Sequence, residues 1–167
     1  MASAALRHLL RVAAIAGCGL AGTAACGEEQ VATAVKDEIF ARKILMDTID
    51  RYMDEIDWML VSGKPIDLAE ATDHADTVSV MLLTLPHLFP RETNRWQPDA
   101  KRDPGRDTYA SPDLWSNFAD FYRRANEASQ IAYDAAHARE EGAFRKSMAA
   151  LREACDSCHA LYMKTDP

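Results

Sequence analysis

Residues 35–60, VKDEIFARKILMDTIDRYMDEIDWML, decide the fold that this sequence predicts. Apolar side chains recur there at alternating steps of four and three residues, and only Arg42 interrupts the series. Such spacing places them on one side of an α-helix, where they pack against neighbouring helices. We predict one helix over residues 32–61, ended by the Gly63 and Pro65 that follow. The series consists of Val35, Ile39, Met46, Ile49, Met53, Ile56 and Leu60.

Three further segments carry the same kind of apolar repeat. The second predicted helix starts after Asp67, a good N-cap residue, and closes at Pro86. The third is entered through Ser111-Pro112, and a break at Glu141-Gly142 separates it from the fourth. Their apolar positions are Leu68, Ala71, Ala75, Val78, Leu82 and Leu85; Leu114, Phe118, Phe121, Ala125, Ala128, Ala132 and Ala135; and Phe144, Met148, Leu151, Cys155, Cys158 and Leu161.

The lengths of the connections predict how these four helices are arranged. Short links join the first helix to the second and the third to the fourth, which makes each pair antiparallel. The connection over residues 86–111 is long and rich in proline, and no segment shows the alternation of a β-strand. We predict an all-α, antiparallel up-down-up-down four-helix bundle. The long connection also carries five basic residues, Arg91, Arg95, Lys101, Arg102 and Arg106.

The first 25 residues have the pattern of a secretory signal. Arg7 and Arg11 precede a short apolar run of small residues, which ends abruptly at the polar CGEEQ. We therefore predict a signal peptide over residues 1–25, a bundle over residues 26–167 and a periplasmic location. Cys26 follows small residues as in a bacterial lipoprotein signal, so lipid anchoring through Cys26 and simple cleavage to a soluble protein both stay open.

Composition limits the kinds of partner that this chain can have. The chain has 167 residues, 48% of them hydrophobic, which is enough for one domain with a core. Its formal net charge is −7, and it becomes −9 once Arg7 and Arg11 are removed with the signal segment. Because nucleic acid attracts basic proteins, we expect no nucleic-acid partner.

Residues 154–164, ACDSCHALYMK, hold the densest group of reactive side chains. Cys155, Cys158 and His159 have the spacing C-x-x-C-H and project from nearly the same side of the fourth helix. This is the attachment signature of c-type haem, in which two thiols bond to the porphyrin and the imidazole coordinates the iron. Zinc would need a fourth ligand, and a thioredoxin-like thiol pair belongs to an α/β fold, so both alternatives are weaker. We predict one covalent haem c.

With these residues in place, the chain resembles the cytochrome c′ family, the class II cytochromes c, over residues 35–164. Besides the terminal CxxCH, the resemblance lies in IFARKILM, LPHLFP and DTYASPDLW. It implies that Cys155 and Cys158 hold the haem and that His159 is the proximal iron ligand. It also implies that Met46 occupies the distal position and that Arg42 and Lys43 lie near the haem edge and propionates.

Physical reasoning about Arg42 agrees with this implied position. An arginine that faces a core is costly to bury unless it meets an anion, and a haem propionate would supply one. The alternative is an arginine whose side chain reaches out to solvent at the end of the bundle.

Two functions follow from the two possible roles of Met46. If its thioether bonds the iron, the iron is six-coordinate and low-spin, and the protein carries electrons. We expect this outcome, which corresponds to a methionine-ligated branch of the family. The alternative is a five-coordinate haem that binds NO or CO at the distal face. In either case we expect no enzyme and assign no catalytic residue.

Three partner predictions complete the sequence analysis. We expect redox partner proteins, and we predict that the basic 86–111 connection lies at the haem pole and helps to dock an acidic one, a solvated loop being the alternative. A second apolar line on the first helix, formed by Leu45, Tyr52 and Met59, is compatible with a homodimer.

Overall fold

The structure is a computed structural model that describes residues 22–61, 65–97 and 108–164, with side chains from residue 30 onward. The chain divides into two compact units, Met1–Ala34 and Val35–Pro167. In the first unit, residues 22–34 are helical and form the start of α1 (Gly22–Val61). The predicted signal segment up to residue 21 and the side chain of Cys26 lie outside what is described. Among the described residues, no helix has the length and apolar character needed to cross a membrane.

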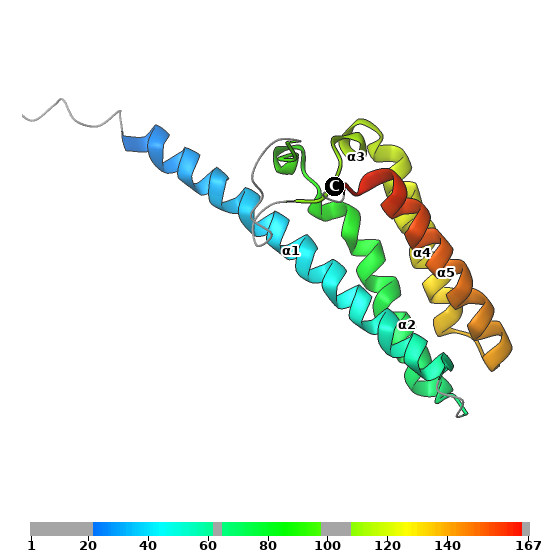
Figure 1. Cartoon of the computed structure of the whole chain (residues 1–167). Coiled ribbons are helices and arrows are strands. Elements are labelled where there is room, and N and C mark those ends of the chain that lie inside the picture. Colours follow the sequence, from blue (N-terminus) through cyan, green and yellow to red (C-terminus); the bar gives the residue numbers. More distant parts are fainter. Residues whose placement is uncertain (1–21, 62–64, 98–107, 165–167) are drawn as a thin grey trace, which may run out of the picture. The chain divides into compact units, whose positions relative to one another are not determined.

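The second unit is the predicted antiparallel four-helix bundle (Figure 1). Its long helices are the remainder of α1, then α2 (Leu68–Thr84), α4 (Phe118–Ala136) and α5 (Glu141–Tyr162). Between α2 and α4 the chain forms two short 3-10 helices, η1 (Leu85–Leu88) and η2 (Arg91–Thr93), and the five-residue α3 (Pro112–Ser116). Within the described part of the chain, the only β-type pairing is a bridge between Ala110 and Met163.

The predicted helix starts at Asp67 and Ser111 are confirmed. The Asp67 carboxylate accepts hydrogen bonds from the backbone N–H groups of Ala69 and Glu70, and so caps α2. The Ser111 hydroxyl accepts from the N–H of Asp113 at the start of α3. α1 ends at Val61 as predicted, but it begins at Gly22 rather than at residue 32, because the preceding residues also adopt helical geometry.

Two other predicted boundaries are wrong. The third predicted helix is interrupted at Asn117, whose N–H and side-chain amide both donate to Asp113 O, at 2.9 and 3.0 Å. These bonds close α3 before α4 starts. The break before the last helix lies at residues 137–140 rather than at Glu141-Gly142. Glu140 is extended and its carbonyl accepts from Phe144 N–H, so Gly142 lies inside the first turn of α5.

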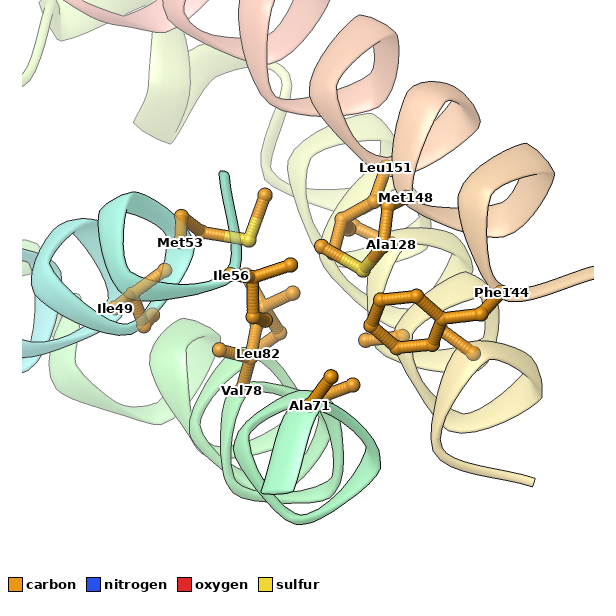
Figure 2. Packing of buried hydrophobic residues seen from close by; sticks show 13 residues of the cluster. Ile49, Met53, Ile56, Ala71, Val78, Leu82, Ala128, Phe144, Met148 and Leu151 are labelled. Carbon is orange, nitrogen blue, oxygen red and sulfur yellow. The ribbon is translucent and has the colours of Figure 1, made fainter. Parts of the chain in front are cut away.

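The predicted apolar stripes form the core of the bundle. Figure 2 shows side chains of α1, α2, α4 and α5 pointing toward one another, among them Ile56, Val78 and Leu151. Two predicted core positions are wrong: Leu161 is 46% exposed and Phe118 is 38% exposed. Tyr162 is buried in place of Leu161, because the buried side of α5 continues from Cys158 by a step of four residues rather than three.

Small residues bring α2 and α4 close together. Ala71, Ala75 and Ala132 are fully buried along these two helices. Ser79 Oγ donates to Ser129 O at 3.0 Å, and Ser129 Oγ donates to Ser79 O at 2.9 Å. A side chain can bond the facing helix backbone in both directions only where the helices lie near one another. We call this contact the α2–α4 seam.

Polar contacts join α1 to its neighbours. Arg145 Nη1 on α5 donates to Leu60 O at 3.0 Å, and Arg152 forms an ion pair with Asp57. On the other side, His74 Nε2 on α2 lies 2.9 Å from Glu55 Oε2 on α1. The second apolar line predicted on α1 is not a free surface, because Leu45, Tyr52 and Met59 are half-buried and pack against the core.

Candidate functional site

A cavity of about 470 Å³ lies within the bundle, with walls from α1 and α5. Its volume falls in the range of cofactor and ligand pockets, roughly 300–1,000 Å³. The cavity is lined by all six side chains that the sequence singled out, Arg42, Lys43, Met46, Cys155, Cys158 and His159. The structure therefore brings together residues that lie more than a hundred positions apart in the chain.

The last turns of α5 supply one wall of the cavity. Cys155 and Cys158 are free, half-buried thiols, and His159 is exposed toward the solvent and the cavity. Burial raises the pKa of Cys155 to about 11, and the neighbouring Cys158 adds to this rise. Burial also raises the pKa of Cys158. Both thiols are therefore protonated and poorly nucleophilic at neutral pH in the folded chain without a covalent partner.

Met46 and Lys43 of α1 line the cavity as well. The Met46 side chain is half-buried and packs against both hydrophobic clusters of the bundle. Met53, two turns later, is only 2% exposed and belongs to the core. Lys43 Nζ lies 5.8 Å from the centre of the Tyr109 ring, above the segment that leads into α3. The half-buried methionine on this side of the cavity is therefore Met46.

Arg42 is buried against the segment between α2 and α3. Its side chain is 3% exposed, and Nη1 donates to Thr93 Oγ1 at 2.7 Å and to Leu88 O at 3.3 Å. Nη2 donates to Thr93 O at 3.3 Å, and the guanidinium lies 4.5 Å from the centre of the Phe89 ring. Burial lowers the pKa of Arg42 to about 10, partly opposed by the charge of Glu38.

These contacts show that Arg42 anchors η1 and η2 to α1. They account for its burial without an anion, so the residue is not the solvent-reaching arginine that was the alternative. Because Arg42 also lines the cavity, its predicted contact with a propionate stays a prediction.

Several cavity residues were not identified from the sequence. The apolar part of the lining includes Leu85, Phe89, Leu114, Phe121 and Tyr162. Phe89 is fixed from two sides, because Trp115 Nε1 donates to its carbonyl at 3.1 Å and its ring lies 4.9 Å from that of Phe121. Phe89 lies in the long connection, where no helical repeat indicates which side chains turn inward, and Tyr162 lies on α5 beside the predicted position Leu161. Leu85, Leu114 and Phe121 belong to the predicted apolar repeats, but the sequence did not place them at the site.

Arg124 of α4 also lines the cavity and was missed. Its Nε donates to Asp120 Oδ2 at 2.7 Å, and Tyr162 Oη donates to the same oxygen at 2.6 Å. Asp120 and Arg124 stand four residues apart, a spacing at which helix side chains meet, so their pairing was readable from the sequence. The approach of Tyr162 from α5 was not.

The predicted basic patch is described only in part. Arg91 and Arg95 are exposed, and Arg95 Nε donates to Glu92 O at 3.0 Å. Lys101, Arg102 and Arg106 lie outside the described residues. Asp47, Asp50 and Asp156 line the cavity together with its basic residues, so both signs of charge occur at its walls.

The arrangement of donors fits a covalently held haem. The cavity is mainly apolar, with two thiols and an imidazole on α5 and a thioether on α1. Thiols spaced C-x-x-C can bond to a porphyrin, while imidazole and thioether are ligands that suit iron. In the described part of the chain, no three His, Cys, Asp or Glu side chains are placed to hold a metal ion directly.

Comparisons with known proteins place this chain among c-type haem proteins. A family model described as Cytochrome C' matches residues 37–163. The cytochrome c prime from Shewanella frigidimarina is 22% identical, with a TM-score of 0.67 over 78% of this chain and 97% of that one. No curated protein matches the chain.

Two further solved structures have the same fold at lower identity. A nitric oxide complex of a mutant cytochrome c prime from Alcaligenes xylosoxidans is 16% identical, with a TM-score of 0.65. A cytochrome c' described as having an unusual ligand-controlled dimer dissociation is 18% identical, with a TM-score of 0.66. Each match covers 78% of this chain and 97% of the other.

Proposed function

Because the chain belongs to the cytochrome c′ family, we propose that it is an exported haem protein that binds a diatomic gas, NO or CO, in the cavity between α1 and α5. It carries one haem c, covalently attached through Cys155 and Cys158. When bound, the haem supplies an iron that can change oxidation state or take up a small ligand.

The roles of the cavity residues follow from their positions. His159, next to the attachment cysteines, is the proximal ligand of the iron. Met46 approaches the cavity from α1 and covers the distal side. Lys43 is placed to attract a propionate at the edge of the cavity, and Arg42 holds the segment with Phe89 in the cavity wall.

One observation carries the proposal: a single apolar cavity brings the CxxCH turn and Met46 together. The packing of Met46 against both hydrophobic clusters is what a covering side chain requires. A protein with the same fold has been solved as a nitric oxide complex, and this likeness supports the proposal of gas binding here. These points favour the gas-binding function over the electron carrier that the sequence led us to expect.

Electron transfer is the second candidate function. The observation that favours it is the thioether of Met46 itself, a soft donor that lines the same cavity as His159. If this sulfur bonds the iron, a thioether ligand raises the reduction potential, and the protein serves redox partner proteins. The exposed Arg91 and Arg95 would then help to dock an acidic partner.

A Met46→Leu variant separates these two functions, because it removes the sulfur and keeps an apolar side chain of similar size. Under the gas-binding function, the ferrous and ferric absorption spectra and the EPR spectrum stay those of the wild type, and CO binds to both proteins. If Met46 is a ligand, the variant changes from low-spin to high-spin and gains CO binding that the wild type lacks.

Met53→Leu is the matched control, since Met53 also lines the cavity but is buried in the core two turns farther along α1. It should leave the spectra unchanged. A spectral change in Met53→Leu alone would mean that the distal residue has been misidentified.

We also propose that the mature protein is periplasmic, begins at residue 26 and forms homodimers. Large apolar side chains of α1 remain exposed, with Phe40 at 59%, Ile44 at 49% and Trp58 at 67%. They recur at helical spacing, which suits a contact between two copies. Ile44→Lys should lower the mass measured by light scattering, and Val80→Lys, an exposed change on α2, should leave it unchanged.

Palmitate released by hydrolysis of the exported protein would establish lipid anchoring at Cys26. Its absence, together with a start at residue 26, would establish the soluble form.

A further inference from the structure

We propose that Arg124 raises the reduction potential of the haem, because its guanidinium is held in the cavity wall beside Ser157, the residue before Cys158. The proposal rests on the haem site proposed above but holds for either role of Met46. It concerns a residue outside the CxxCH motif and outside α1.

Arg124 is fixed at the cavity by contacts on both of its sides. Its side chain is 28% exposed, and Nε donates to Asp120 Oδ2 at 2.7 Å on its own helix. Across the helix interface, Nη1 lies 3.5 Å from Ser157 Oγ on α5. The Asp120 carboxylate in turn accepts from Tyr162 Oη at 2.6 Å. Ser157 and Tyr162 stand on either side of Cys158 and His159 in the chain, so this network brackets the haem-attachment turn.

The charges of this network remain constant over the neutral pH range. Hydrogen bonds from Tyr162, Arg124 and Arg123 hold the pKa of Asp120 far below its ordinary value. Burial and the neighbouring carboxylate raise the pKa of Tyr162. The carboxylate therefore stays ionised, the phenol stays neutral and the guanidinium keeps its positive charge. An effect of Arg124 on the haem should accordingly not depend on pH near neutrality.

The positive end of the network is the part that faces the cavity. Arg124 lines the cavity, whereas its partner Asp120 and the second arginine on that carboxylate, Arg123, do not. Arg124 is also the only charged cavity residue contributed by α4 among the described residues. The guanidinium is thus a positive charge in the cavity wall, in contact with Ser157 of the haem-attachment turn.

The other charged cavity residues have different partners. Arg152 pairs with Asp57, and Arg42 is bound to Thr93 and Leu88. Lys43 lies over the Tyr109 ring, and the carboxylates of Asp47, Asp50 and Asp156 partly balance these cations. A fixed positive charge near the iron disfavours the ferric state, which carries one more positive charge than the ferrous state. Arg124 should therefore shift the equilibrium toward the ferrous protein.

The test is a redox titration of the holoprotein, followed by its absorption spectrum, for Arg124→Gln and the wild type. We expect the equilibrium constant for reduction to fall about fivefold in Arg124→Gln, the order of magnitude for one charge at an intermediate effective dielectric constant. Arg124→Lys keeps the charge and should stay close to the wild type.

Arg123→Gln is the matched control. Arg123 also donates to Asp120, at 2.5 Å, but is half-exposed and does not line the cavity. It should change the reduction equilibrium much less than Arg124→Gln does. If Arg124→Gln does not fold, Ser157→Asp serves instead, because a carboxylate beside Nη1 offsets the same charge without altering the interior. It should lower the equilibrium constant for reduction as well.

The proposal would be overturned if Arg123→Gln and Arg124→Gln changed the reduction equilibrium equally, or if neither Arg124→Gln nor Ser157→Asp changed it. In these cases haem content and CO binding would still be those of the wild type, and the proposed function would stand. A wild type without attached haem would overturn the proposed function and this proposal together. Tyr162→Phe tests whether the effect comes from the tyrosine rather than from the arginine. This variant should lower the free energy of unfolding but leave the reduction potential unchanged.

Discussion

The α2–α4 seam and the α1–α5 side of the bundle are built from side chains of opposite kinds. Alanine and serine line the seam, where each of the two serines bonds the backbone of the facing helix. Between α1 and α5, the facing residues are long, sulfur-bearing or charged, and they surround a cavity of about 470 Å³. Small side chains let two helices approach, whereas large and polar ones hold two helices apart and line the space between them.

The seam therefore contributes mainly to the stability of the domain, and the α1–α5 side contributes mainly to haem binding. The seam is held by hydrogen bonds from serine hydroxyls to the facing backbone and by close packing, and its alanine and serine residues include no titratable group. The α1–α5 side has every predicted haem contact, and Arg145 and Arg152 join α5 to the last turns of α1. Substitutions in the seam should therefore change the free energy of unfolding first, and substitutions around the cavity should change haem binding first.

The sharpest test of this contrast makes the same substitution on both sides. Ala132→Leu forces three extra carbon atoms into the fully buried seam and should lower the free energy of unfolding by about 3 kcal/mol. Ala154→Leu points into the cavity, so it should cost the haem-free protein less than about 1 kcal/mol. Urea unfolding of both haem-free variants measures the difference.

For the amount of attached haem, we expect the two variants to rank in the opposite order. Ala154→Leu should reduce the amount of covalent haem, whereas Ala132→Leu, if folded, should keep it. Equal unfolding costs for the two variants would mean that the cavity side is as tightly packed as the seam.

A smaller loss is expected when the anchor of η1 and η2 is removed. Arg42→Met keeps an apolar stem but leaves the carbonyls of Leu88 and Thr93 without their donors in a buried place. We expect a loss of about 2 kcal/mol in the free energy of unfolding. Lys43→Met, the neighbouring change on a half-buried residue, should cost less than half as much. A haem-free Arg42→Met protein as stable as the wild type would show that the segment is held by Phe89 and Trp115 instead.

The cavity side should also give the haem-free protein a pH dependence that the seam cannot give. The pKa of Cys155 is raised to about 11, whereas an exposed cysteine ionises near pH 9. Between these values the unfolded chain releases a proton that the folded chain keeps, so stability falls as pH rises from 9 to 11. We expect a loss on the order of 1 kcal/mol, allowing for partial solvent screening.

Urea titrations at several pH values measure this effect. The holoprotein should lack it, because a thioether does not titrate, and haem-free Cys155→Ser should lack most of it. The same slope in haem-free Cys155→Ser would assign the effect to another group.

The smallest effect tests the hydrogen bonds of the seam. Ser79→Ala removes one donor and leaves Ser129 O without it, at a cost of about 1 kcal/mol. Ser116→Ala, on the exposed side of α3, should change the free energy of unfolding by less than about 0.5 kcal/mol. Thermal unfolding of the two variants resolves this difference. Equal melting temperatures would mean that the packing of alanine residues, and not the serine hydrogen bonds, accounts for the stability of the seam.

The sequence predicted the helices and most of the core because both follow from a repeat that a single helix imposes. Where the chain leaves that repeat, prediction failed. The interruption at Asn117 and the exchange of Leu161 for Tyr162 depend on contacts between α3, α4 and α5. A periodic pattern on one segment contains no information about such contacts.

The site shows the same division. Cys155, Cys158 and His159 were found because haem attachment demands a fixed local spacing. The anomaly at Arg42 was also visible, but not its partner Thr93, because Thr93 lies 51 residues away in a segment without periodicity. Phe89 was missed for the same reason. Arg124 lies in the regular helix α4, but only the folded chain shows that it turns toward the cavity.

The seam also bears on the order in which this protein is assembled. It is made of residues 71–135, in the interior of the chain, whereas the cavity depends on residues near 42–46 and 154–159. We expect hydrogen exchange to be slowest in the middle of α2 and α4 and faster in the haem-binding turns of α5 before haem is attached. Attachment of the haem would then connect an early segment of the chain in α1 to a late segment in α5, after the α2–α4 seam has formed.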